Sequence, residues 1–271
     1  MAEGPIGAVL LGHGSARGRC AADGLRAVGE RLSRRLAGRA IVRVAFFEFL
    51  APDLAAALTE LEGCGCRDVV ILPYFLFDGK EVRIEIPALV ETLAAAHPRL
   101  RLTIAQSLGV DDRLVEILVE RVEQALRGQG LLLPLGGRLP VRGEAGAVGV
   151  VLVNRGSRAR YDDGTRLRTL CAQLAVRLGV PVEPAQAERS EELTIERAVD
   201  RLIDQGRERI VVVPYLHFPG KVLAVNVVPP VRRLALRYPE HRFYLARPLC
   251  LDDRLVALCA DRFAEARSEG G

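Results

Sequence analysis

Residues 69–80, with the sequence VVILPYFLFDGK, return 141 positions later as IVVVPYLHFPGK at residues 210–221. Each copy begins with consecutive apolar residues, mostly β-branched, as expected for a strand buried on both faces of a parallel sheet. Each copy then continues through Pro-Tyr into an apolar loop that ends in Gly-Lys. A repeat of this length is too long for a solenoid unit and indicates a duplicated domain.

Further blocks repeat in the same order. VLLGHGS at residues 9–15 matches VLVNRGS at 151–157, and DDRLV at 111–115 recurs at 252–256. Because the intervals between the blocks also agree, we expect two similar halves at residues 1–128 and 147–271. A stretch rich in Gly and Pro at residues 129–146 reads as the linker between them.

Short apolar runs alternate with longer stretches of helical period in each half. In the first half the expected strands lie near residues 6–11, 41–47, 69–73 and 101–105. The helices that follow them are expected near residues 21–37, 51–63, 82–96 and 111–127. This alternation predicts an α/β fold with two tandem, doubly wound, parallel four-stranded sheets. Ligands of such sheets gather beyond the carboxyl ends of the strands, so chemistry is expected there.

Composition is that of an ordinary folded protein, with 49% hydrophobic and 27% charged residues among 271. The net charge of +4 comes from basic and acidic residues interleaved along the chain, which argues against a nucleic-acid footprint. The sequence contains neither an 18-residue apolar run nor a signal-peptide pattern, so we expect a cytoplasmic protein without membrane contact. Its six cysteines have no zinc-type spacing and read as small buried hydrophobes, with Cys64 and Cys66 the only close pair.

Three residues that can bind a metal follow successive strands of the first half. His13 comes directly after the first strand, Glu48 ends the second, and Glu81 begins the helix after the third. One imidazole with two carboxylates suits a labile divalent ion such as Co²⁺, Fe²⁺, Ni²⁺ or Zn²⁺. The alternatives are an exposed loop histidine, a Glu48 that caps a helix or meets an arginine, and a Glu81 explained by the helix dipole alone.

The second half replaces these residues. Arg155 stands for His13, Arg189 stands for Glu48 by gap placement, and Val222 stands for Glu81. Guanidinium groups recognise carboxylates, so this half is expected to hold an anionic substrate while the first half handles the metal. His217 replaces Leu76 in the apolar loop, where it either faces the cleft and moves protons or packs within the loop.

The motifs GHGS at residues 12–15, FEFLAPDL at 47–54 and PYFLFDGKEVRIEIP at 73–87 together resemble the sirohydrochlorin chelatase family, the class II cobalt and iron chelatases. The resemblance spans almost the whole chain, since longer members also contain two halves. It implies a ferrochelatase-type fold with two four-stranded sheets that face each other across a tetrapyrrole cleft. It also implies metal ligands at His13, Glu48 and Glu81, although Glu81 stands where the family pattern has histidine. The more distant ferrochelatases use a histidine with a glutamate.

The implied activity is insertion of Co²⁺, Fe²⁺ or Ni²⁺ into sirohydrochlorin or a related tetrapyrrole by a monomer, with His13 and Glu81 catalytic and the metal as substrate. No iron–sulfur cluster is expected, because no Cys-rich tail is present. The expected substrate contacts are Gly14, Ser15, Arg17, Tyr74, Phe75, Lys80, Arg155, Ser157, Arg189, His217 and Lys221. Two alternatives remain open: a non-catalytic tetrapyrrole or metal carrier, and a phosphate-ester enzyme that uses the GHGS turn as an anion cradle.

Overall fold

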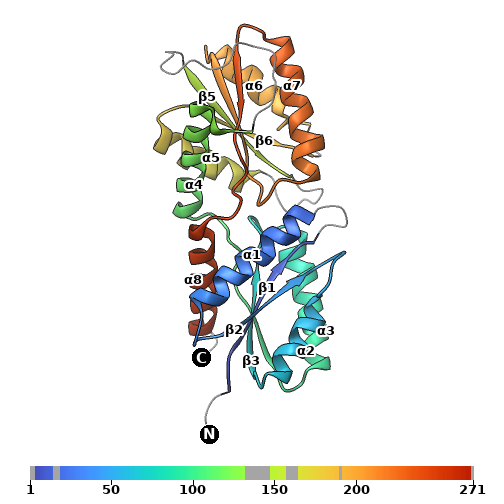
Figure 1. Ribbon diagram of the computed structural model, residues 1–271. Coiled ribbons are helices and arrows are strands. Elements are labelled where there is room, and N and C mark those ends of the chain that lie inside the picture. Colours follow the sequence, from blue (N-terminus) through green and yellow to red (C-terminus); the bar gives the residue numbers. More distant parts are fainter. Residues whose placement is uncertain (1–3, 15–18, 132–146, 157–163, 189–190, 270–271) are drawn as a thin grey trace. The chain divides into compact units, whose positions relative to one another are not determined.

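The computed structural model describes residues 4–14, 19–131, 147–156, 164–188 and 191–269 (Figure 1). The chain divides into two compact units. Unit 1 consists of Met1–Asp111 together with Leu251–Gly271, and unit 2 consists of Asp112–Cys250. Each unit contains one parallel four-stranded sheet, which confirms the predicted fold class.

The sheet of unit 1 has the strand order β2-β1-β3-β4. Its strands are β1 (Gly7–Gly12), β2 (Ile41–Phe46), β3 (Asp68–Pro73) and β4 (Arg101–Ile104). The helices of this unit are α1 (Arg19–Arg35), α2 (Leu54–Gly63), the π-helix η1 (Glu81–Glu85), α3 (Ile86–Ala96) and α8 (Asp253–Glu269). Because the chain leaves β1 toward β2 and returns to β3 on the other side, the switch point of the sheet lies between β1 and β3.

Unit 2 repeats this arrangement in the order β6-β5-β7-β8. Its strands are β5 (Val148–Asn154), β6 (Val182–Gln186), β7 (Arg209–Pro214) and β8 (Arg242–Leu245). Its helices are α4 (Asp112–Gln124), η2 (Ala125–Gln129), α5 (Thr165–Leu178), α6 (Ile195–Asp204), η3 (Val222–Val227) and α7 (Val228–Arg237). A π-helix therefore follows the apolar loop in both units, at the same place in the repeat.

The last helix of each sequence half belongs to the unit built from the other half. Helix α8, from the end of the chain, packs on α1 and β3 of unit 1, and α4 packs on α5 and β7 of unit 2. The compact units therefore differ by one helix each from the halves expected at residues 1–128 and 147–271. Most of the expected linker, residues 132–146, lies outside the described residues.

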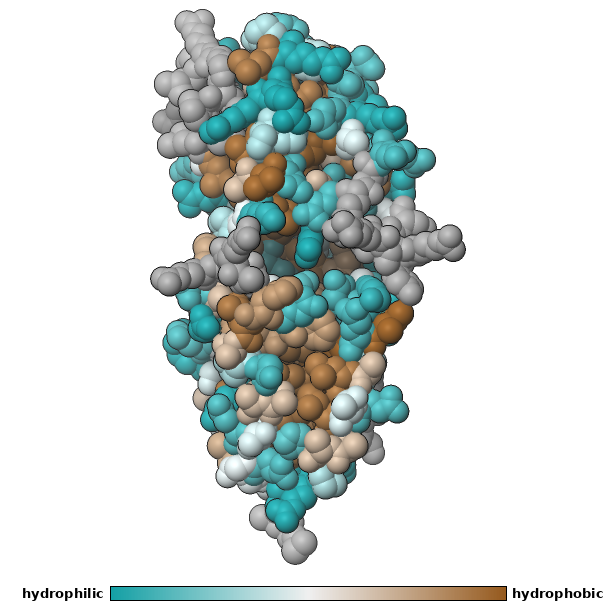
Figure 2. All heavy atoms as spheres, turned by 90° about the vertical axis from the view of Figure 1, so that its right-hand side faces the viewer, coloured by the Kyte–Doolittle hydropathy of each residue, from teal (hydrophilic) through white to brown (hydrophobic). Residues whose placement is uncertain are grey.

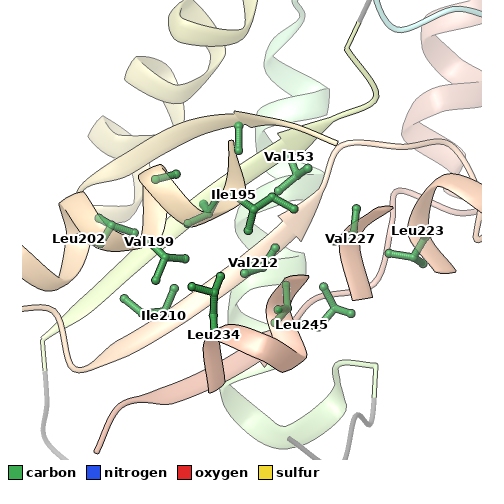
Figure 3. Packing of buried hydrophobic residues seen from close by; sticks show 14 residues of the cluster. Val153, Ile195, Val199, Leu202, Ile210, Val212, Leu223, Val227, Leu234 and Leu245 are labelled. Carbon is green, nitrogen blue, oxygen red and sulfur yellow. The ribbon is translucent and has the colours of Figure 1, made fainter. Parts of the chain in front are cut away.

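Helices cover both faces of each sheet, so the central strands are buried except at the first residue of β3, β5 and β7. All six residues of β1 are buried, as the apolar sequence of the strand requires. In unit 2, Val153 and Val212 from neighbouring strands meet one stripe of α6, formed by Ile195, Val199 and Leu202 (Figure 3). The spacing of four and three residues along α6 places its apolar side chains on one face of the helix.

The outer helices are amphipathic rather than uniformly apolar. In the part of the chain that the structure describes, we find no helix with both the length and the apolar character needed to cross a bilayer. Hydrophilic and hydrophobic side chains are mixed on the surface that Figure 2 displays. Of the six cysteines, Cys66, Cys171 and Cys259 are buried as expected, whereas Cys20 and Cys64 are exposed.

Candidate metal site

The three predicted metal-binding residues meet at the carboxyl edge of the unit 1 sheet. His13 Nδ1 lies 4.0 Å from Glu48 Oε2, and His13 Nε2 lies 3.9 Å from Glu81 Oε1. Since β1 lies between β2 and β3, the imidazole that follows β1 stands between the two carboxylates. The prediction that these distant residues converge is correct.

Backbone hydrogen bonds position the histidine. The Phe47 N–H donates to the Gly12 carbonyl and the Glu48 N–H donates to the His13 carbonyl, both at 2.8 Å. These bonds extend the pairing of β1 with β2 beyond the last strand residues. Gly14 makes the close approach possible, because a Cβ on this residue would lie 1.9 Å from the Glu48 carbonyl oxygen. Its φ of +86° also favours glycine.

Glu81 is the first residue of η1, directly after the apolar loop. A carboxylate is stabilised there by the unpaired N–H groups of the helix start. Gly79 leaves room for the Glu81 carboxylate, because a Cβ on this glycine would lie 2.8 Å from Glu81 Oε2. Single turns of π-helix are rare in proteins and occur often at functional sites. Glu81 can therefore be stabilised by the helix dipole and still face the His13 imidazole.

The two carboxylates face opposite nitrogens of the imidazole. Among described atoms, His13 Nδ1 is buried and has no hydrogen-bond partner, with Glu48 the nearest anionic group. Metal–nitrogen and metal–oxygen bonds are each about 2.1 Å long, so one ion can join Nε2 and Glu81 if the pair closes by about 0.5 Å toward tetrahedral geometry. As described, no three His, Cys, Asp or Glu side chains are already gathered closely enough to hold one ion.

The side chains of the site are partly open to solvent. Relative exposures are 29% for His13, 43% for Glu48 and 34% for Glu81. Two aromatic rings flank the imidazole. Phe49 is nearly parallel to it at a centroid distance of 6.5 Å, and Phe75 is tilted by 38° at 6.4 Å. The site therefore combines a polar donor set with an apolar wall, as small-molecule sites commonly do.

The other predicted contacts in unit 1 have different outcomes. Phe75 lines the site, whereas Tyr74 is 3% exposed and belongs to the core, so its predicted substrate contact is not supported. Its backbone continues the sheet by donating to the Leu11 carbonyl at 2.8 Å. Lys80 forms an ion pair with Glu85 at 2.6 Å. The predicted residues Ser15 and Arg17 lie outside the described residues.

The corresponding position of unit 2 holds a different pair. Arg155 Nε lies 3.6 Å from Glu188 Oε2, and the Glu188 N–H donates to the Arg155 carbonyl, as Glu48 does to His13. Gly156 repeats Gly14, since a Cβ there would lie 2.4 Å from the Glu188 carbonyl oxygen. Asn226 of η3 also donates to the Glu188 carboxylate at 3.1 Å. Unit 2 therefore keeps the carboxylate and replaces the imidazole with a guanidinium.

This register corrects one sequence assignment. Gln186 pairs with Asn154 in the way that Phe46 pairs with Gly12, so Glu188 is the equivalent of Glu48. Arg189, which had been placed there by gap position, is the next residue and corresponds to Phe49. The error is one residue. The second half is two residues shorter between its first two strands, whereas the interval from the first strand to the third is only one residue shorter. Arg189 and Ser157 lie outside the described residues.

The remaining predicted contacts of unit 2 differ in accessibility, because both ring nitrogens of His217 are buried. Lys221 is exposed at the start of η3, and His217 is half-buried beside Phe218, with ring centroids 6.3 Å apart. The sequence patterns did not single out Phe49, Glu188 or Asn226. The shared Glu of FFE at residues 46–48 and QAE at 186–188 was the signal that would have identified Glu188.

The chain repeats one doubly wound sheet, and at the positions compared above the imidazole stands in one copy and a guanidinium in the other. It is therefore a duplicated α/β protein whose copies have diverged. The family model described as CbiX matches this chain twice, at residues 7–125 and 149–266. The chain therefore belongs to the CbiX family. The resemblance seen in the sequence motifs is confirmed, and the two matches fall in the two sequence halves.

Individual relatives agree with this assignment. A sirohydrochlorin cobaltochelatase of Priestia megaterium is 23% identical over 230 residues, which cover 85% of this chain and 70% of the relative. A sirohydrochlorin cobaltochelatase of Saccharolobus solfataricus is 30% identical over 125 residues, 44% of this chain and 94% of the relative. The solved structure of SirB from Bacillus subtilis with Fe³⁺ has a TM-score of 0.74 at 20% identity and covers 98% of both chains. This last likeness shows a shared fold.

Proposed function

We propose that this protein inserts a divalent metal ion, Co²⁺ or Fe²⁺, into sirohydrochlorin. The observation that carries the proposal is the position of His13 between Glu48 and Glu81 at the switch point of the sheet. The names of the relatives support the substrate, and structures of SirB with Fe³⁺ and with cobalt support the choice of metal. Ni²⁺ is a further substrate that the same ligand types accept.

The metal ion is received by His13 Nε2 and the Glu81 carboxylate. Glu48 faces Nδ1, so it accepts a hydrogen bond from the Nδ1–H group when Nε2 binds the metal and the 4.0 Å separation closes, and it adds negative charge beside the cation. A carboxylate behind a metal-bound histidine fixes the tautomer and the orientation of the ring. In this arrangement Glu48 orients the His13 ring and does not bind the metal itself, whereas the sequence alone had suggested that Glu48 is a direct ligand.

Insertion releases two protons from the pyrrole N–H groups as the metal binds to the ring nitrogens. Glu81 is the base closest to the metal position, and its carboxylate accepts a pyrrole proton once the ion has moved from it to the macrocycle. His13 is the second base. Transfer of protons to positioned side chains contributes about 10²–10⁴-fold to a rate. The donors thus bind the metal first and accept protons afterwards.

The carboxylate groups of the tetrapyrrole need cationic partners. In unit 2, Lys221 is exposed, and Arg155 has a half-exposed side chain that makes one ion pair at 3.6 Å and retains further N–H donors. Arg17 and Arg189 complete this proposed set from outside the described residues. We propose that one chain suffices for the reaction.

The test is metal insertion followed by the absorption spectrum. Purified full-length protein is incubated with sirohydrochlorin and Co²⁺, and His13→Ala is compared with His241→Ala as the control. His241 precedes β8 in unit 2 and contacts Glu240 at 3.3 Å. We expect His13→Ala to lower the rate by at least about 10²-fold, and His241→Ala to leave it nearly unchanged. Tight binding of sirohydrochlorin without metallation by the wild type would contradict catalysis and identify a carrier instead.

A further inference from the structure

Phe49 is a large apolar side chain that remains in solvent beside the metal site. It is 67% exposed, whereas Phe75 on the other side of His13 is half-buried. Isolated apolar residues on a surface are common and need no explanation. The backbone of Phe49 and the orientation of its ring, however, are both unusual.

The chain holds Phe49 in a conformation that a residue with a side chain rarely adopts. Its φ is +64°, and the Leu50 N–H donates to the Glu48 carbonyl at 2.9 Å. This bond makes Phe49 the central residue of a γ-turn with positive φ, which is rare and strained. Strained residues persist where the surrounding structure enforces them, and they cluster at ligand-binding sites.

Two contacts enforce the conformation. The Phe46 N–H donates to the Pro52 carbonyl at 2.9 Å and closes the base of the loop at residues 47–52. The Glu48 N–H is bonded to the His13 carbonyl, immediately before the turn. The tip of the loop is therefore attached to the metal site, and the ring of Phe49 is displayed next to His13.

The ring orientation suits a flat ligand that takes a metal from His13. The lone pair of Nε2 lies in the imidazole plane and points at the metal ion. A macrocycle that receives the ion from this direction therefore lies roughly perpendicular to the imidazole plane. The Phe49 ring is within 10° of parallel to the imidazole, so it presents its edge to the same macrocycle face. Edge-to-face contact is a favoured geometry for aromatic rings.

We propose that Phe49 is a substrate-contact residue whose exposed ring holds the face of a conjugated macrocycle against His13. This inference rests on the proposed function and adds to it a specific residue for macrocycle binding. Neither the metal ligands nor the cationic groups need Phe49. Its loss therefore weakens binding of the macrocycle and leaves metal binding intact.

The experiment measures two dissociation constants on the full-length chain. Metal-free sirohydrochlorin is titrated by its own absorption and fluorescence, and Co²⁺ is titrated separately by calorimetry. The variants are Phe49→Ala, Phe49→Gly and the control Leu236→Ala, which truncates another exposed apolar residue, 73% exposed on α7. Phe49→Gly is informative because glycine accepts the positive φ, so this variant keeps or raises the melting temperature.

We expect both Phe49 variants to raise the Kd for sirohydrochlorin by about 5- to 20-fold. The Kd for Co²⁺ should change by less than about 2-fold, and Leu236→Ala should match the wild type in both titrations. Wild-type affinity for sirohydrochlorin in Phe49→Gly overturns the inference, and so does an equal loss of Co²⁺ and macrocycle binding. A wild-type protein that does not bind sirohydrochlorin overturns the proposed function, and this inference with it.

Discussion

Gly14 shows how a single residue without a side chain supports the proposed metal site. His13 and Glu48 are held together because their loops touch at this glycine, where a Cβ would lie 1.9 Å from a carbonyl oxygen. A change to alanine adds this overlap to the strain of a φ of +86°. We expect Gly14→Ala to lower the free energy of unfolding by about 3 kcal/mol and to weaken Co²⁺ binding.

The matched control is Gly38→Ala. Gly38 has a similar φ of +75°, but a Cβ on it would meet nothing within 4 Å. The free energy of unfolding of this variant should fall by about 1 kcal/mol because of backbone strain alone, and its binding of Co²⁺ should be normal. Chemical denaturation and calorimetric titration of both variants check the prediction. Equal effects on stability would mean that the contact with Glu48 is unimportant.

Glu81 allows a sharper test of the donor set. Glu81→Gln removes the negative charge and the basicity but keeps the shape, so we expect metal insertion to fall by at least about 10²-fold. Glu81→His retains a metal ligand and should retain Co²⁺ binding. Glu91→Gln changes an exposed carboxylate on α3 and serves as the control. If Glu81→Gln inserts Co²⁺ at the wild-type rate, the assignment of Glu81 is wrong.

The proximity of the three residues in the proposed donor set was predictable from the sequence because each follows the end of a strand. In a parallel sheet these ends share one edge, so His13, Glu48 and Glu81 had to be near one another. Arg189 was misplaced by one residue because the two-residue difference in loop length between the first two strands is invisible without the pairing of the strands. Phe49 was missed because its positive φ and exposure are properties of the folded loop.

At the scale of helices and strands, the two units tie neighbouring helices together in similar ways. Tyr238, which ends α7, donates its hydroxyl to Asp200 of α6 at 2.7 Å. In unit 1, His97 ends α3 and its Nδ1 lies 2.9 Å from Glu62 of α2. Different residues thus make the same connection between two helices on one face of the sheet.

The connection in unit 2 has a testable dependence on pH. The hydrogen bond to Asp200 raises the pKa of Tyr238 above its ordinary value of 10.0. The folded protein therefore holds this proton more tightly than the unfolded chain does. The stabilisation is complete below pH 10 and is lost as the pH rises through the raised pKa. We expect Tyr238→Phe to lose about 1 kcal/mol at neutral pH.

Above pH 10 the difference in the free energy of unfolding between the wild type and Tyr238→Phe should shrink. The wild type loses the contribution of this hydrogen bond there, whereas the variant lacks it at every pH. Urea denaturation at pH 8 to 11 measures the effect. A constant difference across this range would contradict the proposed role of the hydrogen bond. The sequence predicted the helices themselves, since their apolar periodicity is clear, but it held no signal for this particular pair of side chains.

At the scale of the whole molecule, the exchange of helices between the two sequence halves is the main feature that the repeat did not predict. Periodicity identifies a helix and its apolar face, but it does not say which sheet covers that face. Two arginines at equivalent repeat positions mark the exchange. Arg262 of α8 donates to the carbonyls of Ser107 and Leu108, and Arg121 of α4 donates to those of Pro248 and Leu249.

Substitution of each arginine should destabilise the unit whose loop carbonyls it binds. Arg262→Ala leaves two loop carbonyls of unit 1 without their charged donor, which should cost about 2 kcal/mol. Amide exchange should then accelerate in β3 and β4. Arg121→Ala should accelerate exchange in β7 and β8 of unit 2 instead. Lysine should restore neither, since it lacks the planar fork that reaches two carbonyls. Uniform exchange across both units in either variant would contradict the exchanged packing.

We propose that the chain binds its metal through one imidazole and carboxylate oxygens of unit 1. X-ray absorption at the cobalt edge, on a complex of one Co²⁺ per chain, tests it most directly. We expect one histidine ligand with oxygen neighbours at about 2.1 Å, and loss of the histidine signal in His13→Ala. A sulfur neighbour at about 2.3 Å, as expected from Cys64 or Cys66, or a histidine signal that survives in His13→Ala, would contradict it.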